Sequence, residues 1–494
     1  MTRRTAIRLV GAPVAAAAAP AAFDKDFGSA LAAAAAVRSR KISAVELTKH
    51  VIARIDRHQP KLNAFVYQMR DEALAQARRV DESQRPLGPL ADVPVIVKES
   101  FAIAGRPCTW GIPALQDSKA PKNSTAVQRL IDAGAVSLGA TNVPLELMDG
   151  QSYNAIYGTT NNPWDLKRTP GGSSGGTAAA LAAGLGFLGL GSDIGGSIRA
   201  PAHHCGIFGH KPTLDVVGFL GHSPGGQPGL PGFSTQLAVA GPMARTAEDL
   251  EAALRILGGP EEPESIAYSW KLPPPRHTQA AGFRVGYVLD DPLMPVSSEV
   301  KPALEAAVRS LEKAGAKLKP GWPAGFSLSQ MFDNYLTMLM AFSFSVAPAS
   351  EQARLRPSLA ARKDAEAKAS LIDFASWQQH NLRRLAYRAA WQRYFRDFDA
   401  FPLPVLPVPA FPHDHSLIDH RLIQTPEGKR PYMQTLLTYM SIAPLTGLPA
   451  TAAPVGKTLS GLPVGIQILG PYLEDATPLR LAASLGRFTP PPGY

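Results

Sequence analysis

The chain contains 494 residues, and 45% of them are hydrophobic, so it is long and apolar enough to bury a large core. Its formal net charge of +10 at pH 7 results from 50 basic and 40 acidic residues that are interleaved along the sequence. We interpret this balance as a mildly basic solvated surface, and we expect no nucleic-acid partner. The two cysteines, Cys108 and Cys205, permit at most one disulfide, and the sequence leaves their pairing open.

The first 22 residues have the composition of a targeting segment. Residues 2–8 are basic and include the twin arginines Arg3 and Arg4, and an alanine-dominated stretch follows at 10–22. This pattern is typical of a twin-arginine export signal, and it predicts cleavage near residues 21–23 and a periplasmic or secreted product. The stretch is too short for a membrane span, so we expect none. The N-terminus of an ordinary cytoplasmic enzyme is the alternative.

Helical and strand patterns alternate along the rest of the chain. Ser43 to Glu46 form a capping box before an amphipathic helix that we expect Pro60 to end. Further helices are predicted at 70–81, 124–132, 177–185, from 246 onwards, at 297–314 and at 475–485. Strands are predicted at 93–97, 135–141, 187–190, 283–288 and 462–469, with an extended run at 403–408. This alternation predicts an α/β fold with a mixed sheet covered by helices.

Residues 326–398 are predicted to form a long helical excursion. The stretch contains no glycine after Gly325 and is rich in alanine, leucine, methionine and aromatic residues. We expect these side chains to pack in the core first and to line a substrate pocket second. The proline run at 273–275 is short enough to be a surface connection, so residues 23–494 are predicted to form one domain.

The stretch at 171–213 concentrates glycine around serines. Ser173 and Ser174 lie inside GGSSGG, and Gly195, Gly196 and Ser197 repeat the arrangement. Backbone N–H groups in such turns can converge on an oxyanion while a hydroxyl attacks a carbonyl, which predicts acyl transfer. Serine needs a base, and no histidine and aspartate pair is evident nearby.

Lys98 is the candidate base. It follows the apolar run Val93–Val97, so its amine should lie at the end of a buried strand, where desolvation lowers the pKa of an ammonium. Glu99 should point to the opposite face of the extended chain.

These motifs together resemble the amidase signature family of Ser-Ser-Lys hydrolases. The similar stretches are Lys98 after its strand, GGSSGG at 171–176, GSDIGGSIRAPAHHCGIFGHKPT at 191–213, SAVELTKHVIARIDRHQPKLNAFV at 43–66, GATNVPLE at 139–146, YGTTNNPWD at 157–165, and LTGLPATAAPVG with GLPVGIQILGP between 445 and 471. They cover nearly all of the chain after about residue 25. The resemblance implies a single large α/β fold whose mixed sheet carries helices on both faces.

The resemblance also implies the roles of the site residues. Ser197 would be the nucleophile, Ser173 the bridging serine and Lys98 the terminal base, and the peptide between Gly172 and Ser173 would be cis. The enzyme would hydrolyse a carboxylic acid amide to the acid and an amine or ammonia through an acyl-enzyme.

The oxyanion of that reaction would be held by the backbone N–H groups of Ile194, Gly195 and Gly196. No cofactor or metal is expected. The adjacent residues 203–205, His-His-Cys, lack the spacing of tetrahedral metal ligands, and we interpret them as packing residues.

The chain departs from the family pattern at three positions. Asp92 stands where the family usually has glycine, Glu99 where it has aspartate, and Thr177 where it often has serine. None of them removes a proposed catalytic group, so these departures put substrate shape in question rather than the reaction.

Other functions stay open. Residues 171–175 match the G-x-S-x-G elbow of serine esterases, but no strand pattern precedes them, and the S-x-x-K match at 310–313 lies in a helical pattern. The same triad would also serve the glutamine-hydrolysing subunit of a tRNA-dependent amidotransferase, which the export signal disfavours. A non-catalytic binding protein would need a broken triad. The expected partner is a small-molecule amide of unidentified structure, and the oligomeric state is open, a homodimer included.

Overall fold

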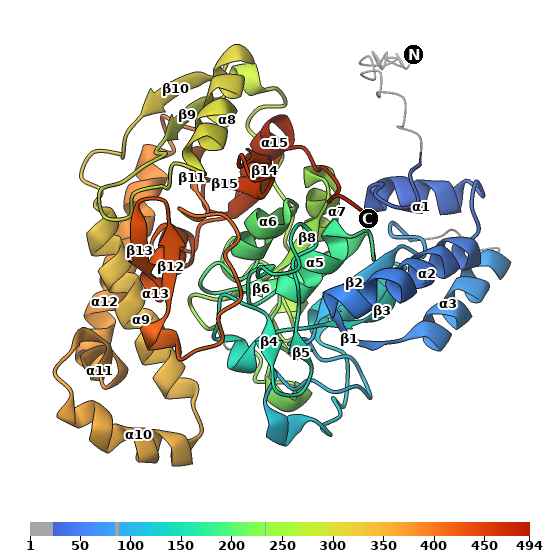
Figure 1. Cartoon of the computed structure of the whole chain (residues 1–494), viewed down its shortest axis with the longest axis horizontal. Helices are drawn as coiled ribbons and strands as arrows, with labels where there is room; N and C mark the ends of the chain where they lie inside the picture. Colours follow the sequence, from blue (N-terminus) through green and yellow to red (C-terminus); the bar gives the residue numbers. More distant parts are fainter. Residues whose placement is uncertain (1–22, 84–87, 233) are drawn as a thin grey trace, which may run out of the picture.

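A nine-stranded mixed sheet forms the centre of the computed structural model, which describes residues 23–83, 88–232 and 234–494 (Figure 1). From one edge to the other its strands are β1 (Phe65–Gln68), β3 (Val136–Thr141), β2 (Pro94–Lys98), β6 (Leu188–Asp193), β8 (Val239–Ala244), β7 (Phe208–Lys211), β14 (Ala450–Lys457), β15 (Pro463–Leu469) and β11 (Phe401–Pro404). Strands β3, β2 and β6 are parallel, and the remaining pairs are antiparallel. The predicted α/β class with a mixed sheet is therefore confirmed.

Seven helices of the described chain pack on this sheet: α2 (Ala44–Leu62), α3 (Arg70–Glu82), α5 (Gly175–Ala182), α6 (Arg199–Cys205), α7 (Ala247–Leu257), α8 (Lys301–Lys313) and α15 (Ala476–Leu485). Helices α1 (Ala30–Arg38) and α4 (Thr125–Asp132) pack on α7, α13 (Tyr432–Leu437) contacts the strand pair at 422–425 and 428–431, and α14 (Ile442–Thr446) leads into β14. Three two-stranded sheets lie outside the main sheet: β4 (Tyr153–Asn154) with β5 (Gly158–Thr159), β9 (Arg284–Tyr287) with β10 (Lys317–Pro320), and β12 (Leu422–Thr425) with β13 (Gly428–Pro431). Helices α5 and α6 pack against each other, and α7 contacts α4 and α15.

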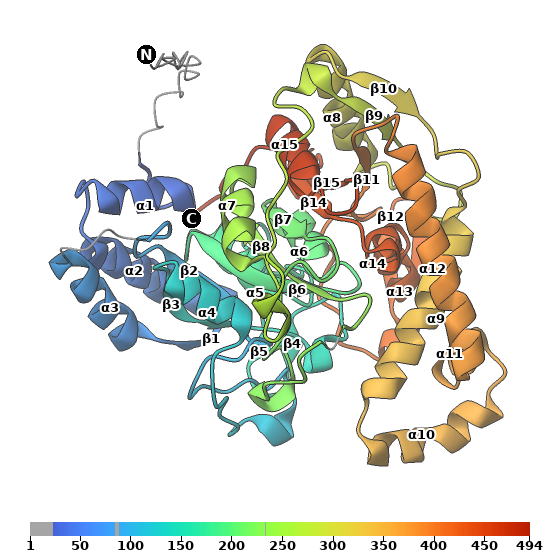
Figure 2. The same ribbon diagram turned by 180° about the vertical axis from the view of Figure 1, so that it is seen from behind.

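The predicted helical excursion is present at the end of the molecule opposite α1–α3 (Figures 1 and 2). It consists of α9 (Leu328–Val346), α10 (Ala349–Ala361), α11 (Ala365–Ser370) and α12 (Phe374–Tyr394). Met331, Tyr335 and Met338 are buried on α9, as the expected core role requires. Helix α9 packs against α14, which leads into β14 of the main sheet.

The predicted end of the helix that follows Ser43 is wrong. Helix α2 contains Pro60 and continues to Leu62. Proline lacks the N–H that a helix interior needs, but here it lies in the last turn, where only one backbone bond is lost. The turn is closed instead by Asn63, which takes a left-handed conformation and donates its N–H to Gln59 O at 2.8 Å.

Arg245 connects the start of the described chain to the core through hydrogen bonds. This residue directly follows β8 and is fully buried. Its guanidinium donates to the carbonyls of Phe27 and Gly28 at 3.1 and 2.8 Å, and to those of Leu181 and Gly186 at 2.9 and 2.7 Å. The predicted export signal at 1–22 lies outside the described residues. Within the part of the chain that the structure describes, no helix is long and apolar enough to cross a membrane.

Candidate active site

Lys98 ends strand β2, an interior strand of the sheet, and is completely buried. Its Nζ lies 2.7 Å from Ser173 Oγ and 2.9 Å from Ser192 Oγ. Burial lowers the pKa of Lys98 to about 7, although the negative charge of Asp193 partly opposes this effect. The structure therefore joins two of the three predicted triad residues and supplies a lysine that is deprotonated in part at neutral pH.

The two glycine-rich loops meet beside Lys98. The peptide between Gly172 and Ser173 is cis, as expected, and Ser174 N–H donates to Ser197 O at 3.1 Å. A Cβ on Gly172 would lie 2.4 Å from Asp149 O, so only glycine fits there. Ser197 is half-buried, and its hydroxyl has no hydrogen-bond partner among the described residues.

Asp193, which the sequence analysis did not single out, holds the Ser197 loop. Its carboxylate accepts hydrogen bonds from Gly196 N–H at 2.9 Å and Ile198 N–H at 3.2 Å, and it forms a fully buried ion pair with Arg199 at 2.9 Å. Burial alone would raise the pKa of Asp193, but the Arg199 guanidinium holds it below its ordinary value. The signal for this role was the Asp-x-x-x-x-x-Arg spacing inside a loop already marked by glycines.

Because of the same contacts, only two of the three N–H groups in the predicted oxyanion hole are available to a substrate. The N–H of Gly196 is already bonded to Asp193, whereas no acceptor in the described chain holds the N–H groups of Ile194 and Gly195. Tyr335 from α9 donates its hydroxyl to Ile194 O at 3.0 Å. A trans peptide points its C=O and N–H in opposite directions, so this bond fixes the direction of the Gly195 N–H.

The glycines of this loop leave no room for side chains. A Cβ on Gly195 would lie 2.9 Å from Leu437 and 3.0 Å from Tyr335 Oη. A Cβ on Gly196, where φ is +100°, would lie 2.7 Å from the sulfur of Met440. Side chains of α9 and of the segment 437–440 therefore lie directly against the Ser197 loop.

The three departures from the family pattern are all buried. Glu99 accepts hydrogen bonds from Thr109 N–H and Trp110 N–H, and burial raises the pKa of Glu99 to about 7. Asp92 is fully buried with φ +52°, a conformation that favours glycine, and burial raises its pKa to about 7. Thr177 Oγ1 lies 2.7 Å from Thr141 Oγ1. None of these side chains contacts Lys98, Ser173 or Ser197 through a hydrogen bond.

The structure also bears on the rival motifs. Residues 164–170, which precede the G-x-S-x-G match, form no strand, and the S-x-x-K match at 310–313 lies within α8. Cys108 and Cys205 are buried free thiols. His203 packs as predicted, with its ring nitrogens 2.9 Å from Gly465 N and 3.0 Å from Val408 O.

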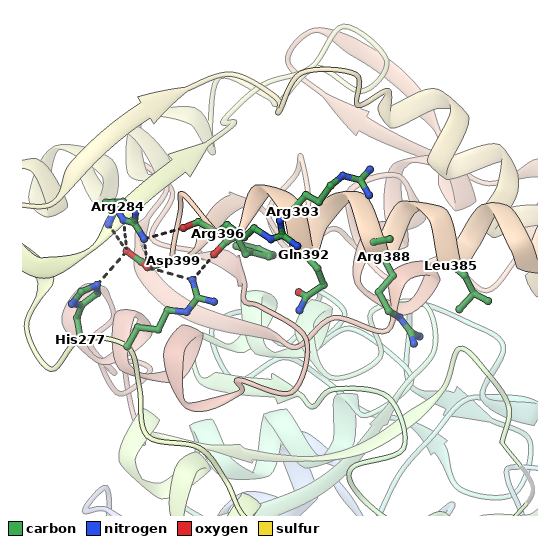
Figure 3. A pocket seen from close by; sticks show the side chains of 11 residues that line it. His277, Arg284, Leu385, Arg388, Gln392, Arg393, Arg396 and Asp399 are labelled. Atoms are coloured by element: carbon green, nitrogen blue, oxygen red, sulfur yellow. Dashed lines mark hydrogen bonds and ion pairs between the residues drawn. The ribbon is translucent and has the colours of Figure 1, made fainter.

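A separate cavity of about 1040 Å³ lies along α12 (Figure 3). It is lined by Arg276, His277, Arg284, Leu385, Arg388, Ala389, Gln392, Arg393, Phe395, Arg396 and Asp399. The Asp399 carboxylate lies there within ion-pair distance of Arg284, Arg276 and His277. The lining includes none of the predicted triad or oxyanion residues.

Comparison with known proteins places the chain in a family. The Amidase family model matches residues 46–479. A glutamyl-tRNA(Gln) amidotransferase subunit from a Synechococcus species is 30% identical, and the match covers 90% of this chain and 93% of that protein. An indoleacetamide hydrolase of Bradyrhizobium diazoefficiens is 32% identical over 90% of this chain and 84% of its own length.

A solved structure supports the same assignment. A bacterial aryl acylamidase of the amidase signature family is 27% identical and superposes with a TM-score of 0.75, covering 93% of this chain and 95% of that one. The family resemblance inferred from the glycine-rich loops and Lys98 is thus confirmed. The chain belongs to the amidase family and is an amide-hydrolysing enzyme.

Proposed function

We propose that this enzyme hydrolyses a small carboxylic acid amide through Lys98, Ser173 and Ser197. The observation that carries the proposal is the 2.7 Å contact between the buried Lys98 amine and Ser173 Oγ, next to the loop that presents Ser197. A lysine whose pKa is about 7 can accept a proton near neutral pH, which an exposed lysine cannot do.

The reaction then runs in two halves. Ser197 Oγ attacks the carbonyl carbon while its proton passes to Ser173, whose own proton passes to Lys98. The N–H groups of Ile194 and Gly195 stabilise the negative charge on the carbonyl oxygen. The C–N bond breaks as Ser173 gives a proton to the leaving nitrogen and takes one back from Lys98, which becomes neutral again. Water then attacks the Ser197 ester through the same proton transfers and releases the acid.

Glutamine is the second candidate substrate. Several relatives at about this level of identity are glutamyl-tRNA(Gln) amidotransferase subunits, including those of Synechococcus and Acidobacterium capsulatum. The twin arginines at the N-terminus weigh against a tRNA-linked role, because tRNA is cytoplasmic. Ammonia release from glutamine, compared with release from aryl and alkyl amides, distinguishes the two candidates.

Ser197→Ala tests the proposed nucleophile. We expect this variant to fold normally and to lose amide hydrolysis, because the hydroxyl supplies chemistry rather than core volume. The rate with a panel of primary, anilide and peptide amides, including glutamine, is the measurement. Ser310→Ala, which alters the S-x-x-K match on α8, should keep the full rate.

A fluorophosphonate probe gives a second readout of the same assignment. Peptide mass spectrometry should locate the added mass on Ser197. Modification confined to Ser173 or Ser174 would contradict the triad and favour the elbow interpretation.

A further inference from the structure

A hydrogen-bond network continues behind Lys98, away from Ser173. Ser192 Oγ, which lies 2.9 Å from Lys98 Nζ, is also 3.0 Å from His222 Nε2. The same nitrogen of His222 lies 3.0 Å from Ser100 Oγ. One imidazole nitrogen therefore faces two hydroxyl groups, one of which contacts the proposed base.

His222 is neutral in this environment. Its ring packs against the rings of Phe101, Trp110 and Phe219, with centroids 4.6, 4.9 and 4.3 Å away. Burial among these side chains, together with the charge that Lys98 carries when protonated, holds the pKa of His222 well below its ordinary value. Lys98 is the charged group that lowers the pKa of His222, and the other neighbours of its ring are these three uncharged aromatic side chains.

The two hydroxyls decide which tautomer the ring adopts. Ser100 Oγ has no other hydrogen-bond partner among the described residues, so its proton is satisfied only when Nε2 of His222 accepts it. A ring that carried its proton on Nε2 would leave the Ser100 hydroxyl without an acceptor. Nδ1 of His222 is buried without a hydrogen-bond partner among the described residues in either tautomer. The Ser100 hydroxyl therefore decides the balance: it favours the tautomer in which Nδ1 carries the proton and the single lone pair of Nε2 is shared between the Ser100 and Ser192 hydroxyls.

This choice fixes the direction of the Lys98 lone pair. A neutral amine has two N–H donors and one lone pair. When the Ser192 proton points to His222, the Ser192 oxygen accepts an N–H of Lys98, and the lone pair is left to face Ser173. With the opposite tautomer, Ser192 would donate to Lys98 and occupy the lone pair that must receive the Ser173 proton.

We infer that His222 is a positioning residue for the proposed base: as a neutral hydrogen-bond acceptor it orients Ser192, and through Ser192 it directs the lone pair of Lys98 toward Ser173. The inference rests on the proposed function of Lys98. His222 itself touches no substrate, and no proton is transferred through it.

His222→Phe removes the acceptor and keeps a ring among the three aromatic side chains. We expect kcat and the rate of Ser197 labelling by a fluorophosphonate to fall by about tenfold or more, and KM to change by less than about twofold. His222→Gln retains an acceptor and should recover part of the loss. In a Ser192→Ala background, where the link to Lys98 is absent, His222→Phe should have no further effect.

The matched control is His58→Phe, which alters another buried histidine that packs on an aromatic ring, that of Tyr494, and should leave both rates unchanged. The inference fails if folded His222→Phe labels at the wild-type rate, if its loss is equal in both backgrounds, or if His222→Gln is no faster than His222→Phe. If His222→Phe does not fold, the effect of His222→Gln is measured instead in the wild-type and Ser192→Ala backgrounds. A loss of rate only where Ser192 is present supports the inference, and the same effect in both backgrounds overturns it. If the wild-type enzyme neither is labelled at Ser197 nor hydrolyses amides, the proposed function is refuted. If the wild-type enzyme is labelled at Ser197 but substitutions of His222 do not change the labelling rate, only the inference about His222 is refuted.

Discussion

The proposed role of Lys98 as a base predicts that activity depends on pH, because only the neutral amine can accept a proton. Burial brings its pKa down to about 7 from 10.5. The neutral fraction therefore grows as the pH rises through about 7, and the rate should fall on the acid side and persist at alkaline pH. A kcat/KM profile against pH measures this limb.

Two substitutions separate a base from a structural cation at this position. Lys98→Ala should lose most activity and flatten the acid limb in whatever remains. Lys98→Arg should not restore the rate, because a guanidinium stays protonated throughout this range. Near-normal turnover by the arginine variant, with an unchanged profile, would show that Lys98 serves only as a charge.

At the scale of single residues, the candidate site could be predicted where its residues lie in short sequence patterns. Lys98 after an apolar strand and two serines among glycines are adjacent-residue patterns, and the structure brings Lys98 and Ser173 together. Asp193 and His222 were missed for different reasons. The aspartate lies within the glycine-rich stretch but acts on backbone N–H groups, whereas His222 reaches Ser192 from 30 positions away, through a loop without a pattern of its own.

At the scale of elements, α9 connects the helical excursion to the site. Tyr335 Oη is its contact with the nucleophile loop, at 3.0 Å from Ile194 O. Tyr335→Phe keeps the ring in the core and removes only this hydrogen bond. We expect kcat to fall by about tenfold with little change in KM, because in the proposed reaction the Gly195 N–H stabilises charge that develops in the transition state.

Thermal unfolding and steady-state kinetics together check this expectation. The melting temperature of Tyr335→Phe should stay within a few degrees of the wild type, since one hydrogen bond contributes only about 1 kcal/mol. A variant that loses stability without losing kcat would assign Tyr335 to packing alone.

Most elements could be predicted because periodicity and capping are local. Ser43, Ser124 and Thr246 each accept a hydrogen bond from the first turn of the helix they precede, as their positions suggested. The effect of Pro60 was predicted wrongly. Proline breaks the interior of a helix, but Pro60 lies in the last turn of α2, and Asn63 caps the helix after it. Strand order and the contact of α9 with the loop are tertiary, and no window of sequence contains them.

At the scale of the whole molecule, the described chain contacts the core directly after the predicted export signal. Arg245 donates hydrogen bonds to the carbonyls of Phe27 and Gly28, and both residues lie downstream of the expected cleavage near residues 21–23. We therefore predict that a chain beginning at Phe23 keeps the melting temperature and activity of the full chain. N-terminal sequencing of enzyme from the native host should find a mature start near this position. An intact Met1 or Thr2 on cytoplasmic enzyme would contradict export and strengthen the glutamine alternative.

The carboxylate of Asp193 has a consequence for the state of the site between turnovers. Backbone N–H groups that converge in a turn form a concave site for an anion. Here the anion belongs to the chain itself: the Asp193 carboxylate, paired with Arg199, accepts hydrogen bonds from the N–H groups of Gly196 and Ile198. For the proposed reaction, this means that folding itself sets the shape of the loop, and we expect no reorganisation of the loop in each catalytic cycle.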